Sequence, residues 1–210
     1  MQKLTEAEFT ELKNTNVLLL DVRPIEEATE NIIANALNIP FGESFLETFQ
    51  TLVNNERAVV LIGNSNNAAK AIRAISGSGF SNLKGYVLAN ELTQTPTSVL
   101  ITLEADEFAM DFNYDDFYLI DVRNADEFNA AHIEFAENIS LDDMETMSQD
   151  FKEDMRIYVV GATAEQAFTA ASILKRNGME LTRAVVANFE EFEQLGLPMI
   201  KPKKDKQAKA

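Results

Sequence analysis

The chain has 210 residues, of which 46% are hydrophobic and 25% are charged, the profile of a soluble globular protein. Its 34 acidic residues outnumber its 18 Lys and Arg, and the formal charge of -16 argues against nucleic acid or an anionic membrane surface as a partner. It contains no cysteine and one histidine, which excludes disulfides, thiolate metal sites, cysteine nucleophiles and histidine clusters, so we expect neither a metal nor a cofactor.

Both ends of the chain are polar. The N-terminal segment MQKLTEAEFTELK lacks the apolar stretch of a secretion signal, and no apolar run approaches the roughly 20 residues that span a membrane. We therefore expect a cytoplasmic protein without membrane contact. The last ten residues, KPKKDKQAKA, hold five lysines and one Asp. We interpret residues 203–210 as a Lys-rich, disordered tail in preference to a basic docking segment.

The first half of the chain alternates short apolar runs with helical patterns. The apolar runs are typical of strands, and they lie at residues 17–22, 36–40, 58–63 and 83–88. A short helix is predicted over residues 24–27, and an Ala-rich helix over 66–75 is followed by a helix-ending glycine, Gly79. Strands that alternate with helices favour an α/β fold, a mainly parallel sheet with helices on both faces.

The second half repeats the first at a spacing of about 100 residues. Within residues 21–40, eight of twenty positions are identical to those 100 residues later without a gap, namely Asp21, Val22, Arg23, Glu27, Ile33, Ala36, Asn38 and Ile39, which match Asp121, Val122, Arg123, Glu127, Ile133, Ala136, Asn138 and Ile139. The Ala-rich helix also recurs, over residues 164–176, and Gly178 follows it. A repeat unit of this length is a whole domain, so the sequence indicates a domain duplication.

The join between the two domains is predicted at TQTPTS, residues 93–98, because Pro, Thr and Ser are typical of a linker. We expect one domain over residues 1–97 and a second over residues 98–202. The aromatic run at residues 107–120 matches the entry segment of the first copy in position. We interpret it as a helix and loop packed on its own domain in preference to a partner-binding face.

Ordered motifs in both halves point to one family. The second half reads LIDVRNADEFNAAHIEFAENIS over residues 119–140, and the first reads LLDVRPIEEATENIIANALNIP over residues 19–40. These follow a pattern of Asp-Val-Arg, Glu-Phe, Gly-His-Ile-Pro-Gly-Ala and Asn-Ile-Pro, with Ile32 in place of the histidine in the first half. Each half therefore resembles a rhodanese homology domain, and the whole chain resembles a tandem rhodanese.

The resemblance implies a sulfurtransferase fold whose active members carry a cysteine in the loop before the central helix. Loop N–H groups and the helix N-terminus would form an anion cradle there, and the thiolate would carry sulfur as a persulfide. The cysteine position falls at Ile62 or Gly63 in the first half and at Gly161 in the second. Neither loop holds a thiol, an Arg or a Lys. The degenerate loop residues are Ile62, Gly63, Asn64, Ser65, Asn66, Asn67, Gly161, Ala162, Thr163, Ala164, Glu165 and Gln166.

Three other side chains near these loops could take part in chemistry. Ser65 and Thr163 would need an activating base to attack a substrate, and we interpret both as loop and helix-capping residues. His132 occupies the histidine position of the family pattern. We interpret it as a structural residue that is satisfied by nearby backbone, in preference to a catalytic base.

The strand-end motif is written twice, as Asp21, Arg23 and Glu27 and as Asp121, Arg123 and Glu127. An arginine here could bind a substrate. The equal four-residue spacing to a helical carboxylate favours instead a structural ion pair from each arginine to its glutamate.

These residues predict a catalytically inactive tandem rhodanese-like protein that works as a binding or scaffolding module. We assign no catalytic residue, and we expect a protein or a small polar ligand as the partner. The alternative is a sulfurtransferase-type enzyme that uses a thiol supplied by a partner. A hydrolase or phosphatase is disfavoured, because related phosphatase loops also rely on Cys and Arg.

Overall fold

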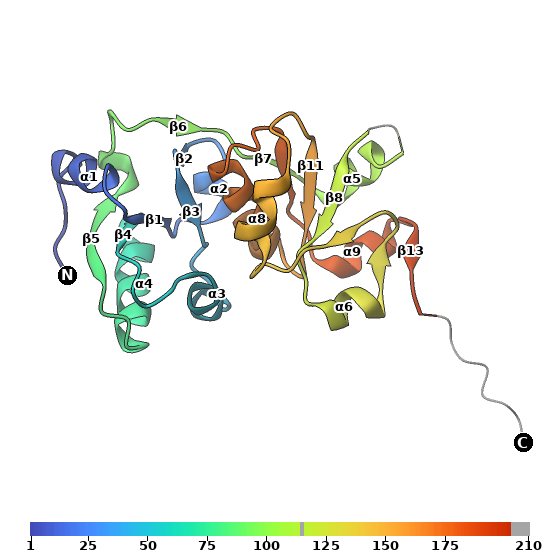
Figure 1. The fold of residues 1–210 in the computed structure, drawn as a ribbon, viewed down its shortest axis with the longest axis horizontal. Helices are drawn as coiled ribbons and strands as arrows, with labels where there is room; N and C mark the ends of the chain where they lie inside the picture. Colours follow the sequence, from blue (N-terminus) through green and yellow to red (C-terminus); the bar gives the residue numbers. More distant parts are fainter. Residues whose placement is uncertain (114–115, 203–210) are drawn as a thin grey trace, which may run out of the picture.

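The structure is a computed structural model, and it describes residues 1–113 and 116–202 (Figure 1). The tail predicted at residues 203–210 lies outside the described residues, as do Tyr114 and Asp115 of the aromatic run. In the described part of the chain, no helix combines the length and the apolar character that crossing a membrane requires.

The first half folds around a parallel sheet of four strands in the order β3-β1-β4-β5. The strands are β1 (Leu18–Asp21), β3 (Ala36–Asn38), β4 (Val59–Gly63) and β5 (Leu83–Leu88). The helices are α1 (Glu6–Lys13), α2 (Ile25–Ala28), α3 (Phe45–Leu52), α4 (Ser65–Gly77) and the 3-10 turn η1 (Ala89–Glu91). Side chains of β1 alternate between the faces: Leu20 joins a core with α3 and α4, and Leu19 joins a core with α1.

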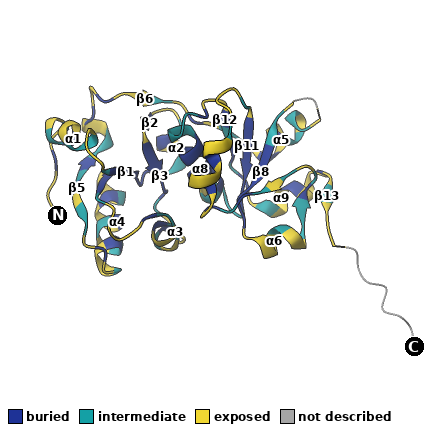
Figure 2. Ribbon diagram, viewed as in Figure 1, coloured by how far each residue is buried: buried dark blue, intermediate teal, exposed yellow. Residues whose placement is uncertain are grey.

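The second half repeats this sheet with one more strand, in the order β10-β8-β11-β12-β7. The strands are β7 (Ile101–Leu103), β8 (Tyr118–Asp121), β10 (Glu137–Asn138), β11 (Ile157–Val160) and β12 (Thr182–Val185). The helices are α5 (Ala105–Asp111), α6 (Ala125–Ala130), α7 (Met144–Met147), α8 (Ala164–Arg176), α9 (Phe189–Gln194) and the 3-10 turn η2 (Ser148–Asp150). Ile120 packs in the core that holds α8, and Leu119 packs in the core that holds α5 and α9. The predicted α/β fold with helices on both faces is confirmed, and the central strands are the most buried elements (Figure 2).

The aromatic run forms part of this second core. Phe108 of α5 is fully buried, and its ring lies 5.7 Å from that of Tyr158 and 5.8 Å from that of Phe192. The described residues of the run therefore form a helix and loop that pack on their own domain, as the sequence predicted.

Each half also has a small antiparallel ribbon. In the first half, β2 (Ile32–Ile33) pairs with β6 (Thr97–Ser98), and in the second, β9 (His132–Ile133) pairs with β13 (Met199–Ile200). The predicted linker at residues 93–98 is thus held against the first half. The backbone N–H of Gln94 also donates to Glu6 Oε1 at 2.7 Å.

The two halves share a buried apolar cluster, because α8 of the second half packs against β3 of the first. Every residue of α8 from 167 to 174 is buried. The Ser172 hydroxyl accepts a hydrogen bond from the Asn38 backbone N–H at 3.0 Å and donates to the Thr169 carbonyl at 2.7 Å. Helix α8 therefore covers the outer edge of β3 and joins the two sheets into one body (Figure 1).

Candidate functional site

The loop between β4 and α4 forms the site of the first half. Asn64, and not Ser65, caps the helix, with its side-chain Oδ1 accepting from the N–H of Asn66 at 3.1 Å and of Asn67 at 2.8 Å. An asparagine oxygen therefore occupies the helix N-terminus, which is the position where an anion would bind.

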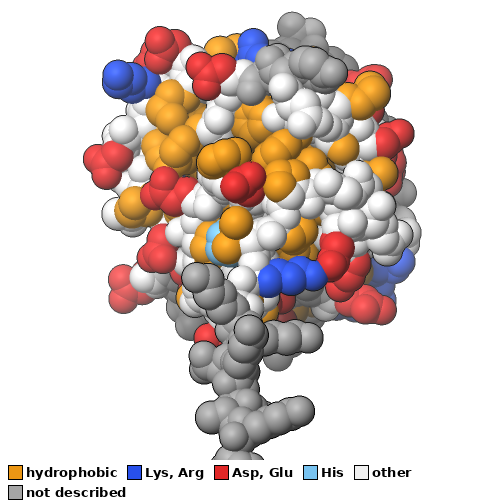
Figure 3. Space-filling model, turned by 90° about the vertical axis from the view of Figure 1, so that its right-hand side faces the viewer, with side chains coloured by type: hydrophobic (Ala, Val, Ile, Leu, Met, Phe, Trp, Pro, Cys, Tyr) orange, Lys and Arg blue, Asp and Glu red, His pale blue; other side chains and the backbone are white. Residues whose placement is uncertain are grey.

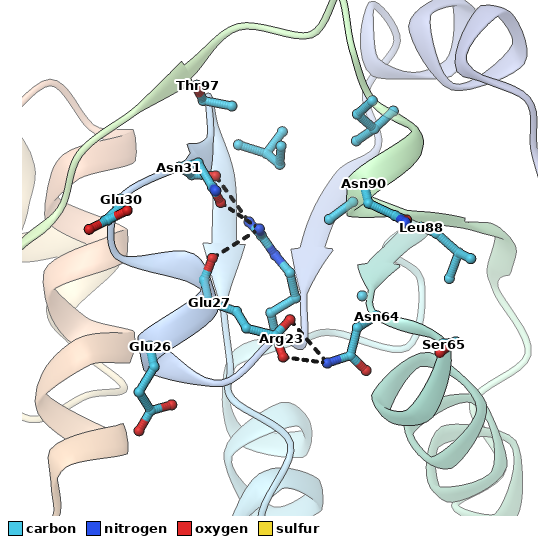
Figure 4. Close-up of a pocket in the computed structure, with 14 residues that line it drawn as sticks. Arg23, Glu26, Glu27, Glu30, Asn31, Asn64, Ser65, Leu88, Asn90 and Thr97 are labelled. Atoms are coloured by element: carbon cyan, nitrogen blue, oxygen red, sulfur yellow. Dashed lines mark hydrogen bonds between the residues drawn. The ribbon is translucent and has the colours of Figure 1, made fainter.

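A carboxylate adds to this arrangement. Asn64 Nδ2 donates to Glu27 Oε1 at 2.8 Å and to Oε2 at 3.1 Å, so α2 and the loop meet through these two side chains (Figure 4). A negative charge next to the loop opposes a second anion such as thiosulfate. The first site thus has the opposite electrostatic character from an anion cradle.

A cavity of about 600 Å³ opens beside this loop. Amide and hydroxyl groups line it, and they come from the turn after α2, the β4–α4 loop with the start of α4, η1 and β6: Asn31, Asn64, Ser65, Asn90 and Thr97. Leu88 and Leu92 supply apolar walls. Figure 4 shows that Glu26 and Glu30 point away from Arg23, so Glu27 is the carboxylate closest to the centre of this group. The cavity therefore offers neutral amide and hydroxyl groups to a ligand, together with an acidic contribution from its glutamates.

The corresponding loop of the second half is filled by its own side chains. Gln166 Oε1 accepts from the Ala162 N–H at 2.7 Å, and Thr163 Oγ1 accepts from the Gln166 N–H at 3.3 Å. A Cβ atom at Gly161 would lie 3.0 Å from Gln166 Oε1, so the glutamine occupies the space where a side chain at residue 161 would begin. Beside the loop, a groove of about 450 Å³ is bounded on its far side by α3 of the first half.

The strand-end arginines do not pair with the predicted glutamates, and that expectation was wrong. Arg23 binds Asp21 instead, with Nε 3.0 Å from both carboxylate oxygens and Nη2 2.6 Å from Oδ2. Its Nη1 donates to the Glu27 carbonyl, not to the carboxylate, and to Asn31 Oδ1. Asp21 is fully buried and Arg23 is 5% exposed, so the guanidinium of Arg23 binds groups of the protein interior and not a ligand in solvent.

Arg123 forms the same pair with Asp121, where Nη2 lies 2.6 Å from Oδ2. Its guanidinium also lies over the Phe189 ring, 3.1 Å from the centroid, and donates to the Ala131 carbonyl. The Glu127 carboxylate accepts from the N–H of Asn124 and so belongs to a capping box of α6. Geometry, and not spacing, decides the partner: residues two apart at a strand end share a face, whereas a residue four further on has entered the helix.

His132 lies at the start of β9, with Nδ1 2.9 Å from the Phe128 carbonyl and its ring stacked on that of Phe128 at 3.9 Å. In the first half the same position holds Ile32, which is 2% exposed. Figure 3 shows the chain's single histidine among hydrophobic side chains on the outer face of the second half. These contacts place His132 against backbone and an aromatic ring.

Sequence reasoning located both loops but missed the groups that fill them. The sequence identifies Asn64 and Gln166 only as loop members, and nothing in their spacing shows that their side chains turn inward. Over the described residues, the structure gathers no group of three His, Asp or Glu that could bind a metal ion. Because the chain has no cysteine, neither loop has a cysteine nucleophile.

Comparisons with known proteins agree with this architecture. The sequence profile of the family described as Rhodanese-like domain matches residues 5–89 and 104–194. The uncharacterized protein YqhL of Bacillus subtilis (strain 168) is 30% identical over 93 residues, which cover 44% of this chain and 71% of YqhL.

Two solved structures are also similar in part. The rhodanese-like domain of the Alr3790 protein from Anabaena sp. aligns with a TM-score of 0.46 at 21% identity, covering 52% of this chain and 85% of that domain. Protein hp1203 from Helicobacter pylori aligns with a TM-score of 0.43 at 26% identity, covering 50% of this chain and 96% of hp1203. The family profile, which matches both halves in turn, decides the assignment: this chain belongs to the rhodanese-like domain family and carries two such domains in tandem.

Proposed function

We propose that this protein works without sulfur transfer of its own, as a binding or scaffolding module built on two inactive rhodanese-like domains. The observation that carries the proposal is the occupied state of both loops. In the first, Asn64 Oδ1 accepts from two helix N–H groups, and in the second, Gln166 Oε1 accepts from the Ala162 N–H. These backbone N–H groups, which could otherwise contact an anionic sulfur donor, already have partners.

The charges around the loops support the same conclusion. A persulfide carrier needs a thiolate, and positive charge nearby keeps that thiolate ionised. Here Arg23 and Arg123 are tied to buried aspartates, and Glu27 lies against the first loop. A cysteine brought in by a partner would therefore meet no uncommitted guanidinium from these motifs. This disfavours a sulfurtransferase that borrows a thiol.

The cavity of the first half is the better candidate for a ligand. It has about 600 Å³ of space and presents the amide side chains of Asn31 and Asn90 together with the hydroxyl groups of Ser65 and Thr97. Such a lining fits a small polar ligand or the polar end of a peptide. The groove of the second half is smaller, at about 450 Å³. Because α3 of the first half forms one of its walls, we assign this groove to contacts between the domains.

The test is a sulfurtransferase assay that measures thiocyanate formed from thiosulfate and cyanide. The wild-type protein is expected to give no turnover above buffer. A Gly63→Cys variant supplies the missing thiol and is also expected to stay inactive, because Asn64 still fills the helix N-terminus and Glu27 still faces the loop. Turnover by the wild-type protein would contradict the proposal. Turnover by the variant alone would show that the cradle is intact and that only the sulfur was lost.

A further inference from the structure

The contact between the two halves uses a different surface on each of them. The first half contributes the outer edge of β3, and the second contributes the outer face of α8. Such a contact is heterologous, so it leaves the counterpart of each surface uncovered. The uncovered pair is α4 in the first half and the edge of β10 in the second.

The outer face of α4 is positively charged, whereas the corresponding face of α8 is buried against the first half. Aligning the helices by their caps, Asn64 and Thr163, places Lys70 opposite Thr169 and Arg73 opposite Ser172. Lys70 and Arg73 are exposed, whereas Thr169 and Ser172 are buried. Neither cation has an ion-pair partner among the described residues. In a chain of net charge -16, this face of α4 thus carries a local positive charge.

An apolar groove of about 450 Å³ runs beside these cations. Ile72 of α4 and Tyr86 and Leu88 of β5 line it, together with Arg73 and with Lys3, which pairs with Glu91. Figure 1 places α4 and β5 at the end of the molecule away from the second half. The α4 face therefore combines an apolar floor with a positive rim, which suits an acidic protein segment.

The β10 edge has the opposite charge. The pairing of Leu20 with Leu37 and of Ile120 with Glu137 places Glu137 at the position of Leu37, the buried residue of the β3 edge. Glu137 is exposed, and within the described residues β10 pairs only with β8. The surrounding segment, residues 124–145, contains seven acidic residues and no Lys or Arg.

We propose that α4 of one molecule packs on the β10 edge of a second copy, so that molecules associate head to tail. The α8–β3 contact inside the chain is the template for this interface. Lys70 and Arg73 meet the acidic β10 segment where Thr169 and Ser172 meet β3, so the neutral hydroxyl residues of the template are replaced by cations that face acidic groups. The contact is heterologous and propagates, which gives open chains instead of a closed dimer. This self-assembly goes beyond the binding role proposed above and does not depend on either loop.

Opposite charges at the two surfaces make the proposal testable by charge reversal. Arg73→Glu places a carboxylate of α4 against the acidic β10 segment, and Glu137→Arg places a guanidinium against Lys70 and Arg73, so each variant alone is expected to lose association by ~tenfold or more through local like-charge contact. In a mixture, each contact between one variant and the other again joins opposite charges, so the mixture is expected to associate in alternating order. Both positions are exposed, although Glu137→Arg also removes the acceptor of the Tyr118 hydroxyl, and matching thermal melts show that the variants are folded.

Sedimentation velocity at increasing protein concentration and at two salt concentrations measures the association. The wild-type full chain is expected to shift to larger species with concentration, and less so at high salt. Lys84→Glu and Glu11→Arg make the same charge changes outside the two surfaces and are expected to behave as the wild type. A wild-type protein that stays monomeric at every concentration would overturn the proposal. So would association that both charge reversals leave unchanged, or a mixture of variants that stays monomeric.

Discussion

The central helices of the two halves have the same length and opposite surroundings. Helix α4 and helix α8 each have 13 residues, begin after a capping side chain and precede a glycine with positive φ, Gly79 or Gly178. In α8 the run 167–174 is completely buried, whereas α4 buries three residues. Equivalent helices of the two domains therefore serve different purposes: α8 forms the interface with β3, whereas the outer face of α4 remains at the surface.

The strand-end ion pairs show the contrasting case, in which the halves agree closely. Arg23 lies 2.6 Å from Asp21 and Arg123 lies 2.6 Å from Asp121, with the same side-chain exposures in both pairs. Breaking a buried pair by removing one partner leaves an uncompensated charge, which makes this framework intolerant of change. The two copies therefore differ in their loops and outer faces, and they share the framework that supports them.

The largest expected effect comes from truncating a large buried side chain of α8. Phe168 is fully buried, whereas the matching Ala69 of α4 is exposed. We expect Phe168→Ala to lower the free energy of unfolding by about 3–5 kcal/mol through lost burial and the cavity that remains. Urea denaturation of the full chain measures this change.

The matched control is Ala69→Ser on α4, for which we expect a change within about 0.5 kcal/mol because the position faces solvent. A loss of less than about 1 kcal/mol for Phe168→Ala would contradict the view that the α8 face stabilises the joined halves.

The sequence of α8 itself indicates a buried helix. Within the segment AEQAFTAASILKR, residues 167–174 are small or apolar on every side of the helix, which is typical of a buried helix. The matching SNNAAKAIRAISG places Lys70 and Arg73 on its outer face. The duplication, the parallel sheets and the two loops follow from such periodic patterns, and the structure confirms the fold.

Other features had weaker signals or none. The pair of Asp21 with Arg23 could have been predicted, because residues two apart on extended backbone lie on one face. The turn of Gln166 into its loop depends on the exact space above Gly161, which no local spacing encodes. Local patterns therefore define the framework, and three-dimensional packing decides whether a loop is open or filled.

A smaller effect is expected from the polar contact between α8 and β3. Ser172→Ala removes the hydroxyl that accepts from the backbone N–H of Asn38, and Asn38 is fully buried. We expect a loss of about 1–3 kcal/mol in the free energy of unfolding, because a buried donor is left without a partner. The same denaturation experiment measures it. Arg73→Ala at the matching position of α4 should stay within about 0.5 kcal/mol, and equal losses for both variants would remove the distinction between the helices.

The turns after β2 and β9 each contain one residue with a positive φ, and this residue differs between the halves. Asn35 has φ of 65° and Phe135 has φ of 66°, and the Phe135 side chain is 81% exposed. Asn tolerates this left-handed conformation better than Phe, so we expect Phe135→Asn to raise the free energy of unfolding by about 0.5–1 kcal/mol. The mirror variant Asn35→Phe should lower it by a similar amount. A loss of stability in Phe135→Asn would show that the ring makes contacts that outweigh the backbone strain.

The smallest effect concerns how the linker is held in the first half. Glu6 accepts from the Gln94 N–H and from the hydroxyl groups of Thr93 and Thr95, whereas the matching Asp106 accepts from the N–H of its own neighbour, Glu107. The Gln94 N–H, with smaller help from the two threonines, holds the pKa of Glu6 below its ordinary value of 4.5.

A lowered pKa means that the folded protein favours ionised Glu6, so this contact is present above pH 4.5 and is lost as the pH falls through the lowered value. The amide proton shift of Gln94, followed by NMR, is therefore expected to titrate with a midpoint below 4.5. Glu6→Gln should abolish that titration, and Asp106→Asn should leave it unchanged. A midpoint at or above the ordinary value would mean that Glu6 does not hold the linker at residues 93–98. Glu6 would then resemble Asp106 of the second half, whose carboxylate accepts only from the N–H of the adjacent Glu107 among the described hydrogen bonds.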